Sequence, residues 1–327
     1  MNLARKIGPL WDPTSQTLHF IDILNPHLYH YHPESGDLQV EECPEAIGCL
    51  ALRKSGGLAC AAAKGFGILG HAESPSKVNI QYVSTPLTEE QKKYTRFNDG
   101  ACDAKGRFWA GTLEYTTEDG IKRPGQLWRY DSSTGEAIMV DDRDLTDSNG
   151  LGWSSDHRTM YFVNSTIKVI YAYDYDLDHG LATNRRIIVD DAILGLSKDL
   201  YGKPDGLCID KQGCIWSARW EASRVVRFTP NGKHIDLEVH IPSAYNVTAC
   251  CFGGPNLDKL YITTASAFAN RYYPKAENVE RQKKFPCSGD LFMVDLSNLC
   301  SGDAHVLGDS RVGAGIGDVD WRYEFSL

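Results

Sequence analysis

The sequence predicts an all-β protein, a six-bladed β-propeller built from four-stranded antiparallel blades. Strand-like apolar runs recur along the chain, and each is followed by a second segment of alternating character. Polar motifs also fall at matching positions in three consecutive repeats. The intervals between equivalent positions are 40, 50, 52, 55 and 45 residues, counted between Leu18, Leu58, Phe108, Met160, Ile215 and Leu260. Self-similarity at such a period, with several short strands per unit, is typical of propeller blades.

The repeated runs come after turns rich in Gly, Asp, Ser or Asn, which bound short strands. The six runs are Gln16–Asp22, Gly56–Ala62, Gly106–Gly111, Arg158–Asn164, Gly213–Ala218 and Asp258–Thr264. We expect each run to be the first strand of a blade, which faces the central channel. The alternating segments that follow are His27–Tyr31, Gly67–His71, Gln126–Tyr130, Val169–Tyr173, Arg224–Phe228 and Asp290–Val294. A further apolar stretch completes most repeats, as in Pro33–Val40, Asp131–Val140 and Thr229–Val239.

Helical segments are scarce, which argues against a parallel α/β fold, since that fold needs a helix between successive strands. Thr88–Tyr94 is expected to form one helical turn, with Thr88 as N-cap and Gln91 three residues later. Ala276–Lys284 is expected to form another helix on the surface of the β framework. A WD-repeat propeller would carry a Trp-Asp dipeptide in most blades, and the chain has one, Trp11-Asp12.

The composition sets outer limits on the class of protein. The chain has 327 residues, 42% hydrophobic and 24% charged, as expected of a globular protein. The repeats run almost end to end without a linker, so we expect one domain over residues 1–327. The net charge of −9, with scattered basic residues, disfavours nucleic-acid binding. No apolar stretch approaches the roughly 18 residues of a membrane span.

The amino terminus and the cysteines together predict a cytoplasmic protein. Residues 1–6 contain no apolar segment of the kind found in secretory signals. The ten cysteines contain no Cys-x-x-Cys, and most lie in apolar strand contexts, so buried free thiols are expected. The expected partner is a small-molecule substrate, and the sequence leaves open whether the protein is a monomer or a homodimer.

Asn149 and Asp205 each stand directly before a Gly, and Asn98 stands directly before Asp99-Gly100. Each lies about ten residues before the equivalent position of an apolar run. Asn-Gly and Asp-Gly are strong turn formers, so one such dipeptide indicates only a turn. Three in register, in consecutive repeats, favour a shared site at the channel mouth. Their oxygen atoms suit a divalent cation such as Ca²⁺, Mg²⁺ or Mn²⁺, with Zn²⁺ as a further option.

These motifs resemble those of the gluconolactonase family, which includes regucalcin and luciferin-regenerating enzyme. The matching segments are Arg96-Phe97-Asn98-Asp99-Gly100, Ser148-Asn149-Gly150-Leu151-Gly152-Trp153, Pro204-Asp205-Gly206-Leu207 and Cys251-Phe252-Gly253-Gly254. The resemblance covers nearly the whole chain in order. It implies a six-bladed propeller with one divalent cation on the channel axis, and hydrolysis of sugar lactones in many members.

Carried over residue by residue, the resemblance implies that Asn149 and Asp205 are metal ligands. It makes Asp205 also the acid/base residue, and Arg96 and Asn98 substrate-binding residues. The implied reaction is metal-assisted hydrolysis, in which the cation polarises the lactone carbonyl and Asp205 manages the proton.

The chain departs from the family pattern at two positions. Ile7 stands where the family has a Glu that is the third protein ligand to the metal, so cation binding is expected to weaken. After Gly111-Thr112 the family often has a Glu that contacts substrate, and here Glu114 is the candidate from a shifted position. Three hypotheses therefore stay open: a metal-assisted lactonase, a divergent enzyme acting on a non-sugar substrate with weak or no metal, and a non-catalytic small-molecule or calcium-binding propeller.

Overall fold

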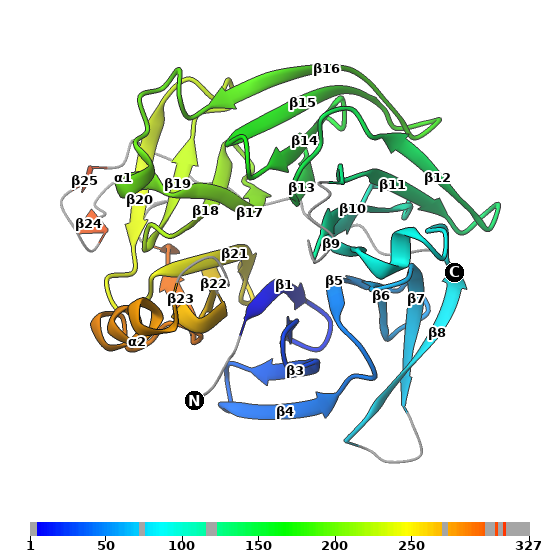
Figure 1. Cartoon of the computed structure of the whole chain (residues 1–327), viewed down its shortest axis with the longest axis horizontal. Coiled ribbons are helices and arrows are strands. Elements are labelled where there is room, and N and C mark those ends of the chain that lie inside the picture. Colours follow the sequence, from blue (N-terminus) through cyan, green and yellow to red (C-terminus); the bar gives the residue numbers. More distant parts are fainter. Residues whose placement is uncertain are drawn as a thin grey trace.

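Six antiparallel sheets are arranged around a central axis in the computed structural model (Figure 1). The structure describes residues 5–71, 76–115, 123–269 and 274–297, together with the backbone of residues 305–306 and 310–311. Five of the sheets have four strands, and the sixth has three strands within the described residues. The predicted six-bladed propeller with four-stranded antiparallel blades is therefore confirmed.

The innermost strand of each blade is the first of its sheet in chain order and faces the axis (Figure 1). These strands are β1 (Lys6–Asp12), β5 (Ile47–Leu52), β9 (Thr95–Cys102), β13 (Ser148–Trp153), β17 (Lys203–Ile209) and β21 (Asn246–Gly253). Each contacts the innermost strand of the next blade, and β21 contacts β1, which closes the ring.

The remaining strands of each blade follow in sequence order toward the outside. The second strands are β2 (Thr17–Asp22), β6 (Leu58–Ala62), β10 (Phe108–Glu114), β14 (Thr159–Asn164), β18 (Ile215–Trp220) and β22 (Lys259–Ala265). The third strands are β3 (His27–His32), β7 (Phe66–His71), β11 (Leu127–Asp131), β15 (Val169–Asp176), β19 (Arg224–Phe228) and β23 (Leu291–Asp295). The outer strands are β4 (Asp37–Glu42), β8 (Val78–Ser84), β12 (Glu136–Asp141), β16 (Leu181–Asp190) and β20 (Ile235–His240).

The sequence analysis expected the repeated apolar runs to be the first strand of each blade, and this expectation was wrong. They form the second strands, and the motifs that contain Asn98, Asn149 and Asp205 lie within the innermost strands themselves. The physical reason is that Asn, Asp and Gly disfavour regular strands, so these segments resemble turns in sequence although they pair as strands.

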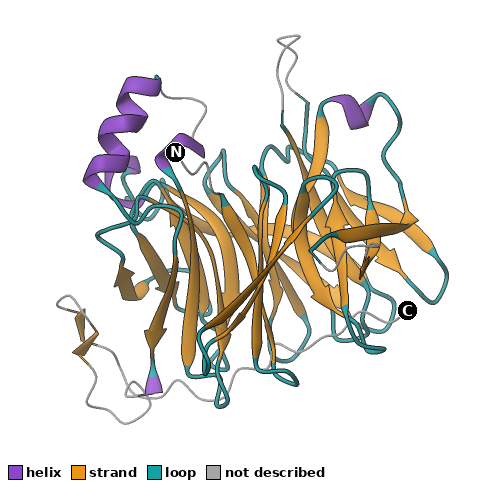
Figure 2. Ribbon diagram, turned by 90° about the horizontal axis from the view of Figure 1, so that it is seen from below, coloured by secondary structure: helices purple, strands orange, loops and turns teal. Residues whose placement is uncertain are grey.

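Helices are confined to short insertions. The expected turn near Thr88 is η1 (Gln91–Lys93), and Thr88 N and Gln91 N exchange hydrogen bonds with each other's side chains at 2.8 and 3.2 Å. The expected C-terminal helix is α2 (Lys275–Lys284). Two further insertions, α1 (Lys198–Tyr201) and η2 (Ala267–Ala269), were not predicted. Figure 2 shows the longest helix, α2, at one end of the ring.

Buried carboxylates anchor the turns between the first and second strands of two blades. The Asp210 carboxylate accepts hydrogen bonds from Trp216 Nε1 at 2.9 Å and from Arg227 Nε at 2.7 Å. Asp103 accepts in the same way from Trp109 Nε1 at 3.4 Å and from Arg107 Nε at 2.5 Å. Trp109 and Trp216 lie in the second strands β10 and β18 and are fully buried, so they pack the blades.

The nine cysteines in the described part of the chain are free, and six of them are buried. Cys300 lies outside the described residues. Over the same described part, none of the helices has the length and hydropathy needed to cross a bilayer.

Candidate active site

Each innermost strand carries an irregularity in its pairing with the second strand. In β9 the pairing skips from Phe97 to Gly100, and in β13 it skips from Ser148 to Leu151. The same skip occurs in β17 between Pro204 and Leu207, and comparable shifts occur in β1, β5 and β21. A bulge leaves residues out of the ladder and redirects their side chains. The bulges therefore turn Asn98, Asn149 and Asp205 out of the regular sheet pattern.

One equivalent position per blade defines a set that we call the hub ring. The far end of each innermost strand pairs with the start of the second strand, for example Trp153 with Met160 and Ile209 with Ile215. The hub ring is the position four residues before the residue that pairs with the equivalent position of the second strand, which is Leu18, Leu58, Phe108, Met160, Ile215 or Leu260. Its members are Ile7, Gly48, Asn98, Asn149, Asp205 and Thr248.

Glycines allow the blades to approach closely around the hub ring. A Cβ on Gly48 would lie 2.5 Å from the Asn98 carbonyl oxygen, and one on Gly150 would lie 2.3 Å from Leu207 N. A Cβ on Gly206 would lie 2.5 Å from the Ala249 Cβ. Gly150 and Gly206, which follow Asn149 and Asp205, are thus required by packing between blades and not by turn geometry.

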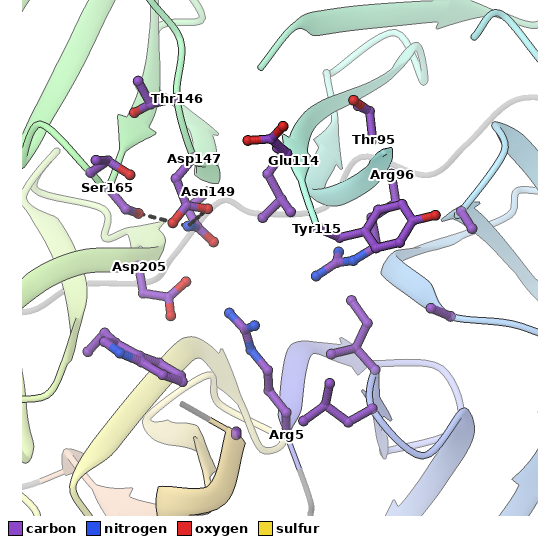
Figure 3. A pocket seen from close by; sticks show the side chains of 18 of the residues that line it. Arg5, Thr95, Arg96, Glu114, Tyr115, Thr146, Asp147, Asn149, Ser165 and Asp205 are labelled. Carbon is purple, nitrogen blue, oxygen red and sulfur yellow. Dashed lines mark hydrogen bonds between the residues drawn. The ribbon is translucent and has the colours of Figure 1, made fainter. Parts of the chain in front are cut away.

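A cavity of about 1170 Å³ is lined by residues from all six blades. The lining comes from the beginnings of the innermost strands and the ends of the second strands, since it includes Thr95 and Glu114 as well as Lys203 and Trp220. Figure 3 shows Arg96, Glu114, Asn149 and Asp205 around the same space. The structure therefore brings four of the five predicted site residues to one cavity.

A second set, the mouth ring, lies two residues before the hub ring in each blade. Its members are Arg5, Ala46, Arg96, Asp147, Lys203 and Asn246, and all except Asn246 line the cavity. Three of them carry positive charge and one carries negative charge. The sequence analysis did not single out Arg5, Asp147 or Lys203, although the spacing of two residues from the hub ring would have found them.

Asn98 lies beneath the cavity wall, with 2% of its surface exposed. Its Oδ1 accepts a hydrogen bond from Arg96 at 2.9 Å, and its Nδ2 donates to the Ser148 carbonyl oxygen and to Asn149 Oδ1, both at 2.8 Å. Asn149 Nδ2 in turn donates to Ser165 Oγ at 2.7 Å. This chain of bonds fixes the orientation of Arg96 and Asn149. Direct contact of Asn98 with a substrate stays a prediction.

The Asp205 side chain is buried and faces the cavity (Figure 3). Burial raises the pKa of its carboxyl group to about 8, and the positive charge of Arg5 opposes that rise. The negative charges of Asp147 and Asp99 add to the increase. An acid whose pKa lies near neutral pH can exchange a proton during a reaction, as general acid–base catalysis requires.

Glu114 lines the cavity and pairs with Arg123, whose Nη1 lies 3.2 Å from Glu114 Oε1. The guanidinium of Arg123 also stacks on the Tyr94 ring, 3.6 Å from its centroid. Trp220 lines the cavity, whereas its neighbour Arg219 is buried in an ion pair with Asp191. The sequence alone could not tell on which rim these two residues lie.

Comparison with known proteins places the chain in a family. The model of the SMP-30/Gluconolactonase/LRE-like region matches residues 7–266. The chain belongs to this family. Regucalcin from Xenopus laevis is 36% identical over 294 residues, which cover 88% of this chain and 90% of that protein. The 6-deoxy-6-sulfogluconolactonase of Pseudomonas putida is 33% identical over 284 residues, covering 87% and 88%.

Solved structures of this family share the fold. A luciferin-regenerating enzyme superposes with a TM-score of 0.78 at 23% identity, covering 97% of this chain and 95% of that chain. A calcium-binding protein, regucalcin, of Agrobacterium tumefaciens superposes with a TM-score of 0.75 at 23% identity, covering 90% and 91%. At 23% identity, the similarity to these two solved structures concerns the fold alone.

The oxygen donors of this family member fit a tightly bound divalent cation poorly. Asp205 is the one carboxylate in the hub ring, and Asn149 Oδ1 already accepts a hydrogen bond from Asn98. Ile7 is buried in an apolar cluster with Ile21 and Ile47. Among the described residues, no three or more His, Cys, Asp or Glu side chains are grouped so as to hold a metal. Calcium prefers roughly six to eight oxygen ligands, and these residues supply too few for tight binding.

Proposed function

We propose that this protein is a lactonase that hydrolyses a sugar lactone or a related cyclic ester in the cavity at the mouth of its central channel. The observation that carries the proposal is the hub ring, where bulged strands of three consecutive blades bring Asn98, Asn149 and Asp205 to equivalent positions, and two of these residues, Asn149 and Asp205, line one cavity. Asp205 lines the resulting cavity with a pKa near the working range of an acid–base catalyst.

The charge of the cavity supports a polar substrate. Arg5, Arg96 and Lys203 outnumber Asp147 in the mouth ring, so the wall is positive at neutral pH. Guanidinium and ammonium groups donate hydrogen bonds to hydroxyl and carboxylate oxygens. A relative at 33% identity is named for a sulfonated sugar lactone, which is an anionic substrate. Lactones of sugar acids, including those with an anionic substituent, are therefore the substrate class.

The reaction needs one water molecule and one proton carrier. The ionised Asp205 carboxylate removes a proton from water as the water oxygen attacks the carbonyl carbon of the lactone. The carbonyl oxygen becomes an oxyanion. Its collapse breaks the bond between the carbonyl carbon and the ring oxygen, which receives the proton from Asp205. The product is the open hydroxy acid, and Asp205 returns to its starting state.

Arg96, Asn98 and Glu114 place the substrate for this attack. Arg96 Nη1 donates a hydrogen bond to Asn98 Oδ1 at 2.9 Å, so the Arg96 guanidinium is oriented before substrate arrives. Glu114 presents a carboxylate to the cavity that can accept hydrogen bonds from sugar hydroxyls, while Arg123 holds it in place. Preorganised groups of this kind reduce the entropic part of the barrier.

A pH-stat assay with glucono-δ-lactone and a panel of other sugar lactones tests the proposal. The wild-type protein should accelerate hydrolysis above the spontaneous rate. Asp205→Ala should lower kcat by about 10²–10⁴-fold, the usual contribution of an acid–base residue. Asp156→Asn, on an exposed turn, is the matched control and should leave the rate unchanged. A wild-type protein that binds lactones without turnover would favour a non-catalytic binding function instead.

A further inference from the structure

Arg5 is held at the start of β1 by contacts of its backbone. Its N–H donates to Asp22 Oδ1 at 3.1 Å, and its carbonyl oxygen accepts from Ile23 N at 3.1 Å. Arg5 also forms a β-bridge with Ala265 at the end of the sixth blade. The position of its Cα is thus fixed by the first blade and by the sixth.

The side chain of Arg5 extends from this anchor into the cavity. Figure 3 shows its guanidinium directed toward Asp205. The guanidinium carbon lies 4.9 Å from the centroid of the Trp220 ring, close enough for a cation–π contact. Arg5 Nε is buried and has no hydrogen-bond partner among the described residues. A buried donor without a partner is costly.

The hub ring carries little negative charge, so the positive charge of Arg5 does not compete there with a strongly bound divalent cation. Ile7 and Gly48 offer no ligand atom. The hydroxyl of Thr248 donates to the Lys6 carbonyl oxygen at 2.6 Å and lies 2.8 Å from Thr263 Oγ1. Asp205 is therefore the single anionic group of the ring, and Arg5 is a single positive charge directed at it (Figure 3).

We propose that the Arg5 guanidinium is the electrophile of this site and takes the role that the family resemblance gives to a divalent cation. The inference rests on the proposed lactonase function. As water attacks, the negative charge that develops on the lactone carbonyl oxygen is stabilised by N–H groups of Arg5. Collapse of the oxyanion restores the carbonyl and releases the ring oxygen, so Arg5 ends the cycle in its starting protonation state. Fixed donors of this kind stabilise a developing oxyanion without reorganisation.

Four proteins test the proposal: wild type, Arg5→Ala, Arg5→Lys and the double variant Ile7→Glu with Arg5→Ala. Calorimetric titration with CaCl₂ and with MnCl₂ measures divalent binding directly, and lactone hydrolysis is measured with and without EDTA. The wild type should bind neither ion tightly and should keep its activity in EDTA. Arg5→Ala should lower kcat by about 10²–10³-fold with little change in KM, as expected when one oxyanion donor is lost.

The other variants separate the role of Arg5 in catalysis from a structural role. Added guanidinium chloride should restore part of the lost activity of Arg5→Ala. Arg5→Lys should keep part of the wild-type activity. The double variant should gain divalent binding, because a carboxylate replaces an apolar side chain and the competing cation is removed. Arg186→Ala, an exposed arginine on β16, is the control and should behave as wild type.

The outcomes distinguish this inference from the proposed function. Stoichiometric calcium or manganese in the wild type, with loss of activity in EDTA, would overturn the role of Arg5. An Arg5→Ala variant with the kcat of the wild type would also overturn the role of Arg5. If the wild type hydrolyses no lactone, the proposed function fails. The divalent titrations of the wild type and the double variant would then still decide whether Arg5 excludes a metal from this site.

Discussion

Asn98 Nδ2 donates a hydrogen bond to Asn149 Oδ1 across 2.8 Å, and this bond joins the innermost strands of two consecutive blades. The two residues are 51 positions apart in the chain and occupy the same position of the repeat. Equivalent residues of neighbouring blades thus contact each other directly at the hub. Repetition in the sequence becomes a continuous polar network that runs from Arg96 to Ser165.

The network predicts that Asn98→Ala reduces activity although Asn98 lies beneath the cavity wall. Removing its amide leaves the Ser148 carbonyl oxygen without this donor, and it takes away one of the acceptors that orient Arg96, whose Nη1 also donates to the Phe97 carbonyl oxygen at 2.8 Å. Each lost buried partner costs about 1–3 kcal/mol. We expect a lower melting temperature and a kcat/KM reduced by about tenfold or more. Asn79→Ala, on the exposed face of β8, should change neither quantity. Unaltered kinetics in Asn98→Ala would show that Arg96 needs no such support.

The pKa of Asp205 predicts the pH dependence of catalysis. As a general base, Asp205 must be ionised, and its pKa of about 8 means that the ionised fraction grows tenfold per pH unit below that value. After subtraction of spontaneous hydrolysis, kcat/KM should rise with pH and level off above about pH 8. Arg5→Ala should move this inflection upward, because the Arg5 charge opposes the increase in pKa. A rate that falls as pH rises from 6 to 9 would assign Asp205 the opposite protonation state.

The same carboxyl group predicts a pH-dependent gain in stability for Asp205→Asn. Below about pH 4 the group is protonated in both the folded and the unfolded chain. Above that pH the unfolded chain releases the proton, while the folded protein retains it up to about pH 8. Wild-type stability should therefore fall through this interval, because the unfolded state binds fewer protons.

Differential scanning calorimetry at pH 5 and at pH 8.5 measures this effect. Asp205→Asn should be more stable than wild type by on the order of 1–3 kcal/mol at the higher pH, and by less at pH 5. Asp156→Asn should show no such dependence, since it lies on an exposed turn. An equal difference at the two pH values would mean that the burial of Asp205 does not govern its ionisation.

Close packing of the blades predicts that Gly150→Ala is strongly destabilising. The added Cβ would lie 2.3 Å from the backbone nitrogen of Leu207, which belongs to the next blade and cannot move aside alone. Overpacking typically costs about 1–3 kcal/mol and occasionally more. Gly70→Ala is the matched control, because nothing lies within 4 Å of the added atom. Urea denaturation of both variants compares them, and equal midpoints would contradict the packing argument.

The fold could be predicted because the second and third strands carry a strong alternating apolar pattern. Phe108 and Ile215, for example, begin strands that are bounded by turns and buried in the blade. The innermost strands could not be recognised as strands. They hold Asn, Asp and Gly at bulges, and the energy that keeps them extended comes from pairing and from contact with the neighbouring blade.

The candidate site was predictable only where the residue type repeats. Asn98, Asn149 and Asp205 share chemistry and spacing, so their convergence could be inferred before any coordinates. Arg5 and Lys203 were missed because the mouth ring mixes opposite charges with an apolar and an amide residue, and only the spacing of two residues before Ile7 and Asp205 marks them as equivalent. The bond from Asn98 to Asn149 also depends on the distance between blades, which no local pattern encodes.

The ring is sealed by contacts between its beginning and its sixth blade: the Thr248 hydroxyl binds the Lys6 carbonyl oxygen, and Arg5 bridges to Ala265. These partners are separated by 242 and 260 residues, so the contacts that complete the cavity are among the slowest for a growing or refolding chain to reach. A partly folded chain, even one with five finished blades, would lack the assembled cavity. Recovery of enzymatic turnover during refolding should therefore lag behind the return of strand structure. Its time course should report when the sixth blade pairs with the beginning of the first.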